Sequence, residues 1–330
     1  MTDEERCLDN LTHSLVGWAL AETGLKHRTR KGLAACVLAA NMPDIDVLFG
    51  WVPWAPLAMH RGFTHGLVGG VLLLPPVLAA LLWLIDRWQA ANGRLAEGAT
   101  PIHFGWLVAL CYLGALTHPL LDLQNVYAVQ LMSPLDDRWY HTDALFIVSP
   151  WLLAFLGLGI WSARRQAMGR SAIAALAAAL GFILLNVGIS LLADDALRMS
   201  SGYPDPDRVF ASPAPVRFWQ REVIWREHGM IGRAQYDPLA GLAMLRGVQP
   251  LVPDNMANPV VHRAAVANAE VRDFLDWSQM PVASVSRQGC TAQVTFGDAR
   301  FAAPAMRESF NAKALIPLDR NHCAESVANR

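Results

Sequence analysis

The sequence predicts a mainly α-helical, multi-pass membrane domain followed by a small, β-rich soluble domain. Of its 330 residues, 53% are hydrophobic and only 17% are charged, whereas soluble proteins carry about 25% charged residues. Long apolar runs occupy the first part of the chain, and alternating polar and apolar residues occupy the last part. We therefore expect a membrane domain over residues 1–195, a linker over 196–215 and a β-rich domain over 216–330.

Four apolar segments are long enough to cross a bilayer, which takes about 17 to 25 helical residues. They are residues 66–85, 105–121, 144–161 and 172–193. Two shorter apolar segments, residues 11–25 and 32–42, precede them. This pair predicts either a helical hairpin that dips into the bilayer or two thin spans.

The charges of the loops predict the orientation, because Lys and Arg concentrate in cytoplasmic loops. Loops 86–104 and 162–171 carry Arg residues, and the basic run 26–31 falls on the same side of the predicted membrane. Residues 43–65 and 122–143 then face away from the cytoplasm, as does everything after the fourth span.

The C-terminal part has a different composition. Residues 202–215 are rich in Pro, Asp and Ser, which is typical of a linker. Residues 216–226 and 282–296 alternate between polar and apolar side chains, as β-strands do. Cys290 and Cys323 are expected to pair if this domain lies in an oxidising compartment.

Composition also excludes some functions. The net charge of −1 argues against nucleic acid as a partner. The five cysteines show no C-x-x-C spacing, so a cysteine zinc cage is not expected. Glycine-loop, serine-hydrolase and H-E-x-x-H motifs do not occur.

The motif T-H-P-L-L-D places His118 and Asp122 at the outer end of the second predicted span. Residues four apart lie on one face of a helix, so both can reach one metal ion, or Asp122 can bridge two. Ionisable groups are costly to keep within a membrane span and usually have a function there. This spacing therefore predicts a metal-ligand pair.

The motif H-R-G-F-T-H precedes the first predicted span. His60 and His65 are not on one helical face. A break in the helix at Gly62 could, however, orient one of the two side chains toward a metal site. Arg61 is a natural partner for a phosphate oxygen. The alternative is a polar interfacial loop in which Arg61 extends toward the headgroups.

Further candidates come from three other segments. In P-D-I-D, Asp44 is the predicted ligand, and Asp46 either orients a histidine, accepts a proton or forms an Asx turn. His13 is a candidate ligand or a simple interfacial residue. His141 and Asp143 are candidates for orienting a ligand or for general acid–base catalysis.

Taken in order, the motifs N-L-T-H-S, P-D-I-D, H-R-G-F-T-H and H-P-L-L-D resemble the YdjM-type family of bacterial inner-membrane, metal-dependent hydrolases over residues 10–193. That family is remotely similar to zinc-dependent phospholipases C and single-strand nucleases. The resemblance implies one or two ions of zinc or another divalent transition metal. It also implies a bacterial inner-membrane location, and the loop charges then predict that the site and the C-terminal domain lie on the periplasmic side.

The expected function is a membrane-bound hydrolase in which a metal-activated water attacks a phosphoester of a lipid or lipid-linked substrate. The predicted metal ligands are His13, Asp44, His60, His65, His118 and Asp122, and the predicted catalytic residues are Asp46, Arg61 and Asp143. The alternative is a non-enzymatic transporter or sensor with a structural metal site. A transport path needs polar groups at mid-depth, and the third and fourth predicted spans carry almost none.

Overall fold

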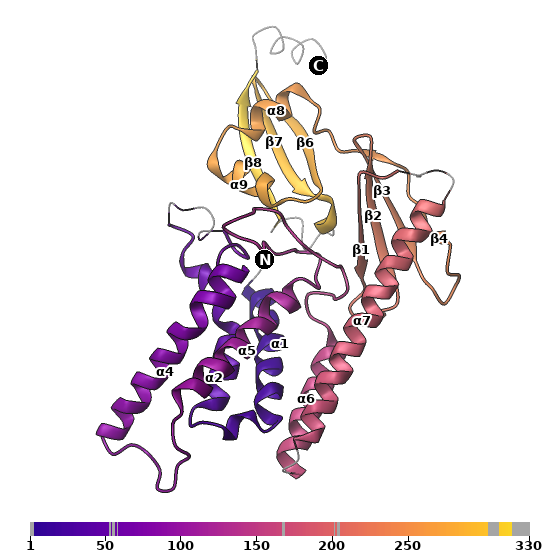
Figure 1. The fold of residues 1–330 in the computed structure, drawn as a ribbon. Helices are drawn as coiled ribbons and strands as arrows, with labels where there is room; N and C mark the ends of the chain where they lie inside the picture. The colour runs from indigo at the N-terminus through magenta and orange to yellow at the C-terminus, as the bar shows by residue number, and fades with distance from the viewer. Residues whose placement is uncertain are drawn as a thin grey trace. The chain divides into compact units, whose positions relative to one another are not determined.

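The computed structural model describes residues 3–52, 54, 57, 59–166, 169–200, 202, 205–302 and 310–318. The chain divides into two units (Figure 1). The helical unit comprises Asp3–Ser190 with Ser212–Phe218, and the β unit comprises Leu191–Ala211 with Trp219–Arg330 and the first two residues. Each unit is described by itself.

The first unit consists of helices and the segments that connect them (Figure 1). They are α1 (Asp3–Glu22), η1 (Leu25–His27), α2 (Gly32–Asn41), η2 (Met42–Leu48), η3 (Leu67–Leu73), α4 (Leu74–Ala91), α5 (Phe104–Asp122), α6 (Pro150–Gln166) and α7 (Arg170–Met199). The segment η3 is a π-helix that continues directly into α4.

The centre of the helical unit is the close packing of α1 and α5 on either side of α2. A Cβ atom on Gly17 would lie 2.7 Å from the Cys36 carbonyl oxygen, and one on Gly114 would lie 2.5 Å from that same oxygen. Only glycine allows backbones to approach so closely. Gly17 follows His13 by about one helical turn and Gly114 precedes His118 by one, so this contact brings the two histidines together.

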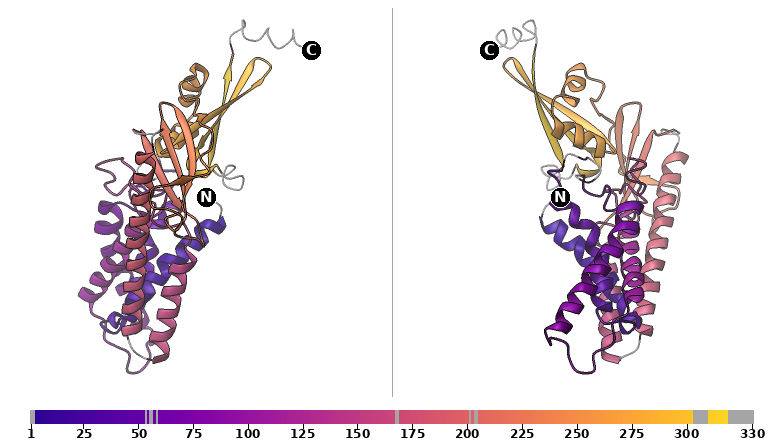
Figure 2. Two further views of the ribbon diagram at one scale, coloured as in Figure 1. Left: turned by 90° about the vertical axis from the view of Figure 1, so that its right-hand side faces the viewer. Right: turned by 60° about the vertical axis from the view of Figure 1, so that its left-hand side comes forward.

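Within the described residues, three helical segments are long and apolar enough to cross a membrane: Leu67–Ala91, Phe104–Asp122 and Arg170–Met199. The predicted count of four spans is not confirmed. The third predicted span, 144–161, corresponds to α6, which begins only at Pro150 and has 17 residues. Before it, Leu145 forms a parallel bridge with Asn125, so the first part of the predicted span is extended chain. Helix α6 packs against α7 (Figure 2), where Gly159 lies directly against Ala175.

The basic loops meet at one end of the helical unit. Arg30, just before α2, donates to both oxygens of Asp86 on α4, at 2.6 and 2.8 Å, and to the carbonyl of Thr100 before α5. Near the end of α6, the Arg164 guanidinium lies 5.4 Å from the ring of Trp18 on α1. The candidate ligands lie at the other end, where α2 and α5 finish.

The described part of the β unit contains two sheets (Figure 1). The first has the order β1-β2-β3-β4, with β5 also paired to β3; its strands are β1 (Arg208–Pro213), β2 (Arg221–Glu227), β3 (Met230–Tyr236), β4 (Leu245–Arg246) and β5 (Val252–Pro253). The second is antiparallel, with β6 (Pro281–Gln288), β7 (Thr291–Asp298) and β8 (Asn311–Pro317) in sequence order. Helices α8 (Pro259–Ala265) and α9 (Ala269–Trp277) bury Val261 and Val271 against β7 and β8.

A small C-terminal domain of antiparallel sheets is thus confirmed. Alternation is clearest in β7, where every second side chain is buried. Two ordered elements enter the segment 196–215 that the sequence predicts as linker: α7 continues to Met199 and β1 begins at Arg208. Cys290 is disulfide-bonded, and its predicted partner, Cys323, lies outside the described residues.

Candidate metal centre

His118 occupies the last turns of α5 and is fully buried. Its Nδ1 donates to the carbonyl oxygen of Ala40 at 2.6 Å, which fixes the tautomer because a carbonyl can only accept. The opposite nitrogen, Nε2, lies 3.2 Å from Asp122 Oδ2 and 3.5 Å from Asp44 Oδ1. The ring is therefore held with its free nitrogen toward the carboxylates.

His13, His118 and Asp122 form a first group, in which three potential ligand atoms all lie within 4.8 Å of one another. His13 Nε2 is 3.5 Å from Asp122 Oδ1, and the rings of His13 and His118 stack at 3.8 Å. All three residues are buried, at most 1% exposed. This deep group is built by α1 and α5 alone.

Asp44, His60 and His65 form a second group under the same 4.8 Å limit. His65 Nε2 lies 3.1 Å from Asp44 Oδ1. Whereas the His65 side chain is fully buried, the side chains of Asp44 and His60 are 21% and 19% exposed. The second group is thus open on one side and the first is closed.

The two groups adjoin through their carboxylates. Asp122 Oδ2 lies 3.4 Å from His65 Nε2, and Asp44 Oδ1 lies 3.5 Å from His118 Nε2. Each carboxylate therefore approaches histidines of both groups, an arrangement that suits bridging ligands. All six residues predicted as ligands converge in one place.

Asp46 lies behind the second group and holds its histidines. Its Oδ1 pairs with His60 Nδ1 at 2.9 Å, and its Oδ2 lies 3.0 Å from His65 Nδ1. It also accepts from the backbone N–H of Arg61 and from Thr64 Oγ1. Burial alone would raise the pKa of Asp46, but the bonds from the two histidines lower it below its usual value. Both imidazoles thereby present Nε2 to the site.

Arg61 points into the protein. Its Nη1 donates to Asn125 Oδ1 at 2.8 Å, its Nη2 lies 3.3 Å from Asp122 Oδ1, and its guanidinium stacks over Tyr127 at 4.6 Å. The residue is 1% exposed and has a φ of 67°. The sequence predicts contact with a substrate phosphate, whereas the structure directs this cation to Asp122, where it balances the carboxylate charge.

Asp143 belongs to neither ligand group among the described residues. Its carboxylate pairs with His141 Nδ1 at 2.9 Å, and its carbonyl accepts from Ser190 Oγ on α7. The two residues singled out before the third predicted span therefore pair with each other.

The loop that carries His60 and His65 folds back onto η3. A Cβ atom on Gly69 would lie 2.2 Å from the Phe63 carbonyl oxygen, and one on Gly70 would lie 2.1 Å from that of Thr64. No side chain fits at either position, and the wide π-helical turn accommodates the approach. The sequence reasoning missed these glycines; their signal is the run G-L-V-G-G directly after His65.

The donors fit a divalent transition metal. Burial would raise the pKa of Asp44, but the charge of His118 and bonds from His118 and His65 lower it. For His65, burial lowers the pKa, whereas bonds to Asp44 and Asp46 raise it above its usual value.

Four potential ligand atoms are buried without an aligned hydrogen bond: Nε2 of His60, Nε2 of His118 and both carboxylate oxygens of Asp122. Buried polar atoms of this kind normally have partners, and imidazole with carboxylate is a suitable ligand set for zinc and its neighbours.

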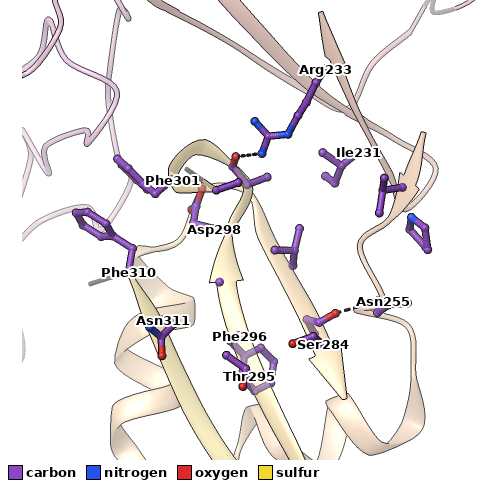
Figure 3. A pocket seen from close by; sticks show the side chains of 17 residues that line it. Ile231, Arg233, Asn255, Ser284, Thr295, Phe296, Asp298, Phe301, Phe310 and Asn311 are labelled. Atoms are coloured by element: carbon purple, nitrogen blue, oxygen red, sulfur yellow. Dashed lines mark hydrogen bonds between the residues drawn. The ribbon is translucent and has the colours of Figure 1, made fainter. Parts of the chain in front are cut away.

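The described part of the β unit contains a cavity, but no group of histidines and carboxylates comparable to this cluster. The cavity has a volume of about 390 Å³, and its lining includes the apolar side chains of Ile231, Phe296 and Phe301 (Figure 3). Two of its polar residues bond to backbone carbonyls: Arg233 donates to that of Ala299 and Asn255 Nδ2 to that of Ala283. The candidate site of this protein is therefore the histidine–aspartate cluster of the helical unit.

These features define a helical membrane protein with a buried histidine–aspartate cluster at one end of its helices. Residues 8–195 match the YdjM inner membrane protein family, and the chain belongs to that family. The predicted family resemblance is thereby confirmed, and a membrane location follows from the family and from the three apolar helices. No curated protein and no solved structure matches the chain significantly.

Proposed function

We propose that the protein is a membrane-bound, metal-dependent hydrolase that acts on a phosphoester of a lipid or lipid-linked substrate. The observation that supports this is the convergence of six ligand residues, in two adjoining groups, around buried atoms without aligned hydrogen bonds. His13, His118 and Asp122 would hold one ion, and Asp44, His60 and His65 would hold a second or complete the coordination of the first.

Zinc or a similar ion, when bound, lowers the pKa of a coordinated water from 15.7 to about 7 and so supplies a nucleophile at neutral pH. The residues of the chain prepare that chemistry. Ala40 and Asp46 hold the histidines by their Nδ1 atoms, as second-shell partners do in metalloenzymes. Arg61 offsets the negative charge of Asp122.

The open side of the cluster indicates where a substrate would enter. Asp44 and His60 are the partly exposed members, and both belong to the second group. Catalytic metal sites keep an open coordination position, whereas structural ones are closed. We therefore assign the reaction to the second group. His60, with Asp46 behind its Nδ1, is also suited to carry a proton on Nε2 if the ion is held by the other residues.

We further propose that the cluster faces the periplasm of a bacterial inner membrane. This rests on the basic residues, such as Arg30 and Arg164, which gather at the opposite end of the helical unit. A cluster at that surface would lie near the lipid headgroups, where phosphoesters are abundant.

Metal analysis of the detergent-purified protein tests the proposal. We expect one or two equivalents of zinc or another transition metal per chain, and at least a tenfold weaker retention in His118→Ala, because a ligand is lost. His103→Ala is the matched control: His103 precedes the same helix at its other end and is exposed. A protein without bound transition metal, or equal retention in both variants, would refute it.

The alternative function, a transporter or sensor with a structural ion, is favoured by one observation: the first group is completely buried. Hydrolysis of phospholipid substrates in mixed micelles, measured as release of the headgroup, of the phosphorylated headgroup or of inorganic phosphate, with and without a chelator, separates the two. Chelator-sensitive hydrolysis supports the enzyme, whereas bound metal without any hydrolysis supports the alternative.

A further inference from the structure

Residues 47–59, V-L-F-G-W-V-P-W-A-P-L-A-M, contain no ionisable side chain and, apart from the two tryptophan indoles, none that forms hydrogen bonds. The segment follows Asp46 and leads to His60, so it directly connects residues of the metal cluster. It is too short to span a bilayer and contains two prolines, which argues against a span. A connection in water would be polar.

Several described apolar side chains of this segment are exposed. Leu48 is 64% exposed, Trp51 80% and Trp54 44%. Helix η2, at the start of this segment, has a buried polar side chain between exposed apolar ones. Asp46 is buried near the histidines, whereas its neighbours Ile45 and Val47 are exposed. Asp46 thus serves the cluster, whereas the apolar side chains on either side of it face the surroundings.

A second loop adds to the same surface. Met132 is 43% exposed and Leu135 83% exposed. Their loop is fixed to the histidine loop, because Gln130 N donates to the Arg61 carbonyl and Leu67 N donates to that of Leu131. We call this set of exposed side chains the apolar rim; it comprises Ile45, Val47, Leu48, Trp51, Trp54, Met132 and Leu135.

The rim continues into a membrane-spanning helix. Leu67 begins the segment Leu67–Ala91, a candidate span, and is itself 40% exposed, followed by exposed Leu72 and Leu73. Leu67 is bonded to the second loop of the rim. The start of this candidate span is therefore joined by a backbone hydrogen bond to the loop that carries Met132 and Leu135.

We propose that the apolar rim is inserted into one leaflet of the membrane, with its tryptophans at the level of the headgroups. Tryptophan favours this interface because its ring is apolar and its N–H is polar. An exposed apolar surface of this kind is otherwise rare on a protein. The partner is lipid rather than protein, because the rim is joined to the start of a candidate span. If the proposed hydrolase activity holds, the rim brings the cluster to the depth at which the phosphoester of a lipid lies.

Site-directed spin labelling of the full-length protein in lipid nanodiscs tests the insertion. Nitroxide labels on Trp51→Cys and Leu135→Cys are exposed to oxygen, which concentrates in lipid, and to a water-soluble nickel chelate. Leu184→Cys, 61% exposed on α7, is the lipid standard, and Leu239→Cys, 79% exposed in the β unit, is the aqueous standard. Cys36 and Cys111 are buried, and labelling of the unmodified protein gives the background.

We expect the two rim labels to collide with the nickel chelate roughly three- to tenfold less often than the Leu239→Cys label, and to collide with oxygen less often than the Leu184→Cys label, which lies near the middle of a candidate span. Nickel collisions equal to those of the aqueous standard would overturn the proposal. So would labels shielded from both reagents, which would indicate a protein partner or a second copy. The measurement needs neither bound metal nor turnover, so it can succeed or fail independently of the hydrolase proposal.

Discussion

The helical unit and the β unit both bury carboxylates beside cations, but they satisfy them differently. In the β unit, Asp298 accepts from Ser278 Oγ at 2.6 Å, from the N–H groups of Gln279 and Met280, and from the backbone and guanidinium of Arg300. In the helical unit, neither oxygen of Asp122 has an aligned hydrogen bond. Buried charge alone therefore does not distinguish the two sites; they differ in whether the buried carboxylate oxygens have aligned hydrogen bonds.

The direction of a pKa shift does not make this distinction. Burial would raise the pKa of Asp298, but the charge and hydrogen bonds of Arg300 lower it. The pKa of Asp44 is lowered in the same direction by histidines of the candidate site. A structural ion pair and a cluster of candidate ligands both lower the pKa of a buried carboxylate. The number and geometry of hydrogen bonds are therefore a better criterion for telling the two apart.

Asp298→Ala should have the largest effect on stability. It would leave the buried Arg300 guanidinium without its main partner, which typically costs about 3 to 5 kcal/mol. Hydrogen exchange of the β6 and β7 amides in the full-length protein measures the change. In the control Glu222→Ala, a half-exposed carboxylate is removed from Arg233, and a loss of about 1 kcal/mol or less is expected. Equal effects of the two changes would show that the Asp298 network is not structural.

Asp46→Asn should weaken metal binding by about 10- to 100-fold, less than loss of a ligand, because it removes only the group that orients two histidines. Competition with a chromogenic chelator measures the affinity. Asp143→Asn is a suitable control, since Asp143 lies in neither ligand group. If the Asp143 variant were the weaker binder, the assignment of the orienting carboxylate would be wrong.

Gly70→Ala should displace the histidine loop, because the added Cβ would meet the Thr64 carbonyl oxygen at 2.1 Å. Overpacking of this kind costs about 1 to 3 kcal/mol, and part of it should appear as weaker metal retention through His65. In Gly181→Ala on α7, the added Cβ has no neighbour within 4 Å. We expect that helix to be unchanged or slightly more stable. Unaltered metal content in the Gly70 variant would contradict this role.

The smallest expected effect is on the stability of the β unit at low pH. The pKa of Asp298 is lower in the folded state than the value of about 3.9 in an unfolded chain. The ionised Asp298 carboxylate therefore contributes fully to stability at pH values above the unfolded-state pKa. This contribution is lost as the pH falls through the folded-state pKa. Between about pH 5 and pH 3, the β unit should lose less stability in Asp298→Asn than in the unmodified protein. Parallel pH profiles of the melting temperature in the two proteins would disprove this.

Much of the candidate site could be predicted from short-range sequence patterns. The spacing of His118 and Asp122 fixes them on one helical face whatever the tertiary structure. In P-D-I-D, Asp44 lies near His118 and Asp46 contacts the Nδ1 atoms of His60 and His65, although the segment is the 3-10 helix η2 rather than extended chain. These patterns do not determine the orientation of a side chain. By sequence, the Arg61 side chain could extend toward solvent or toward the protein interior. In the structure it points inward, with a left-handed backbone conformation and contacts to Asn125 and Asp122.

Hydropathy and local spacing by themselves determined a membrane-embedded helical region, a separate β-rich region and the identity of the candidate ligands, because these depend on composition and on neighbours within one or two turns. Tertiary structure alone decided which histidines meet, since that depends on backbone contacts at Gly17, Gly114 and Gly70 between distant segments. It also shortened the third predicted span, because Leu145 bonds to Gln124 and bridges Asn125, just after α5, instead of continuing a helix. Local sequence carries the propensity for each element, but the partners of a buried polar atom are set only when the elements pack.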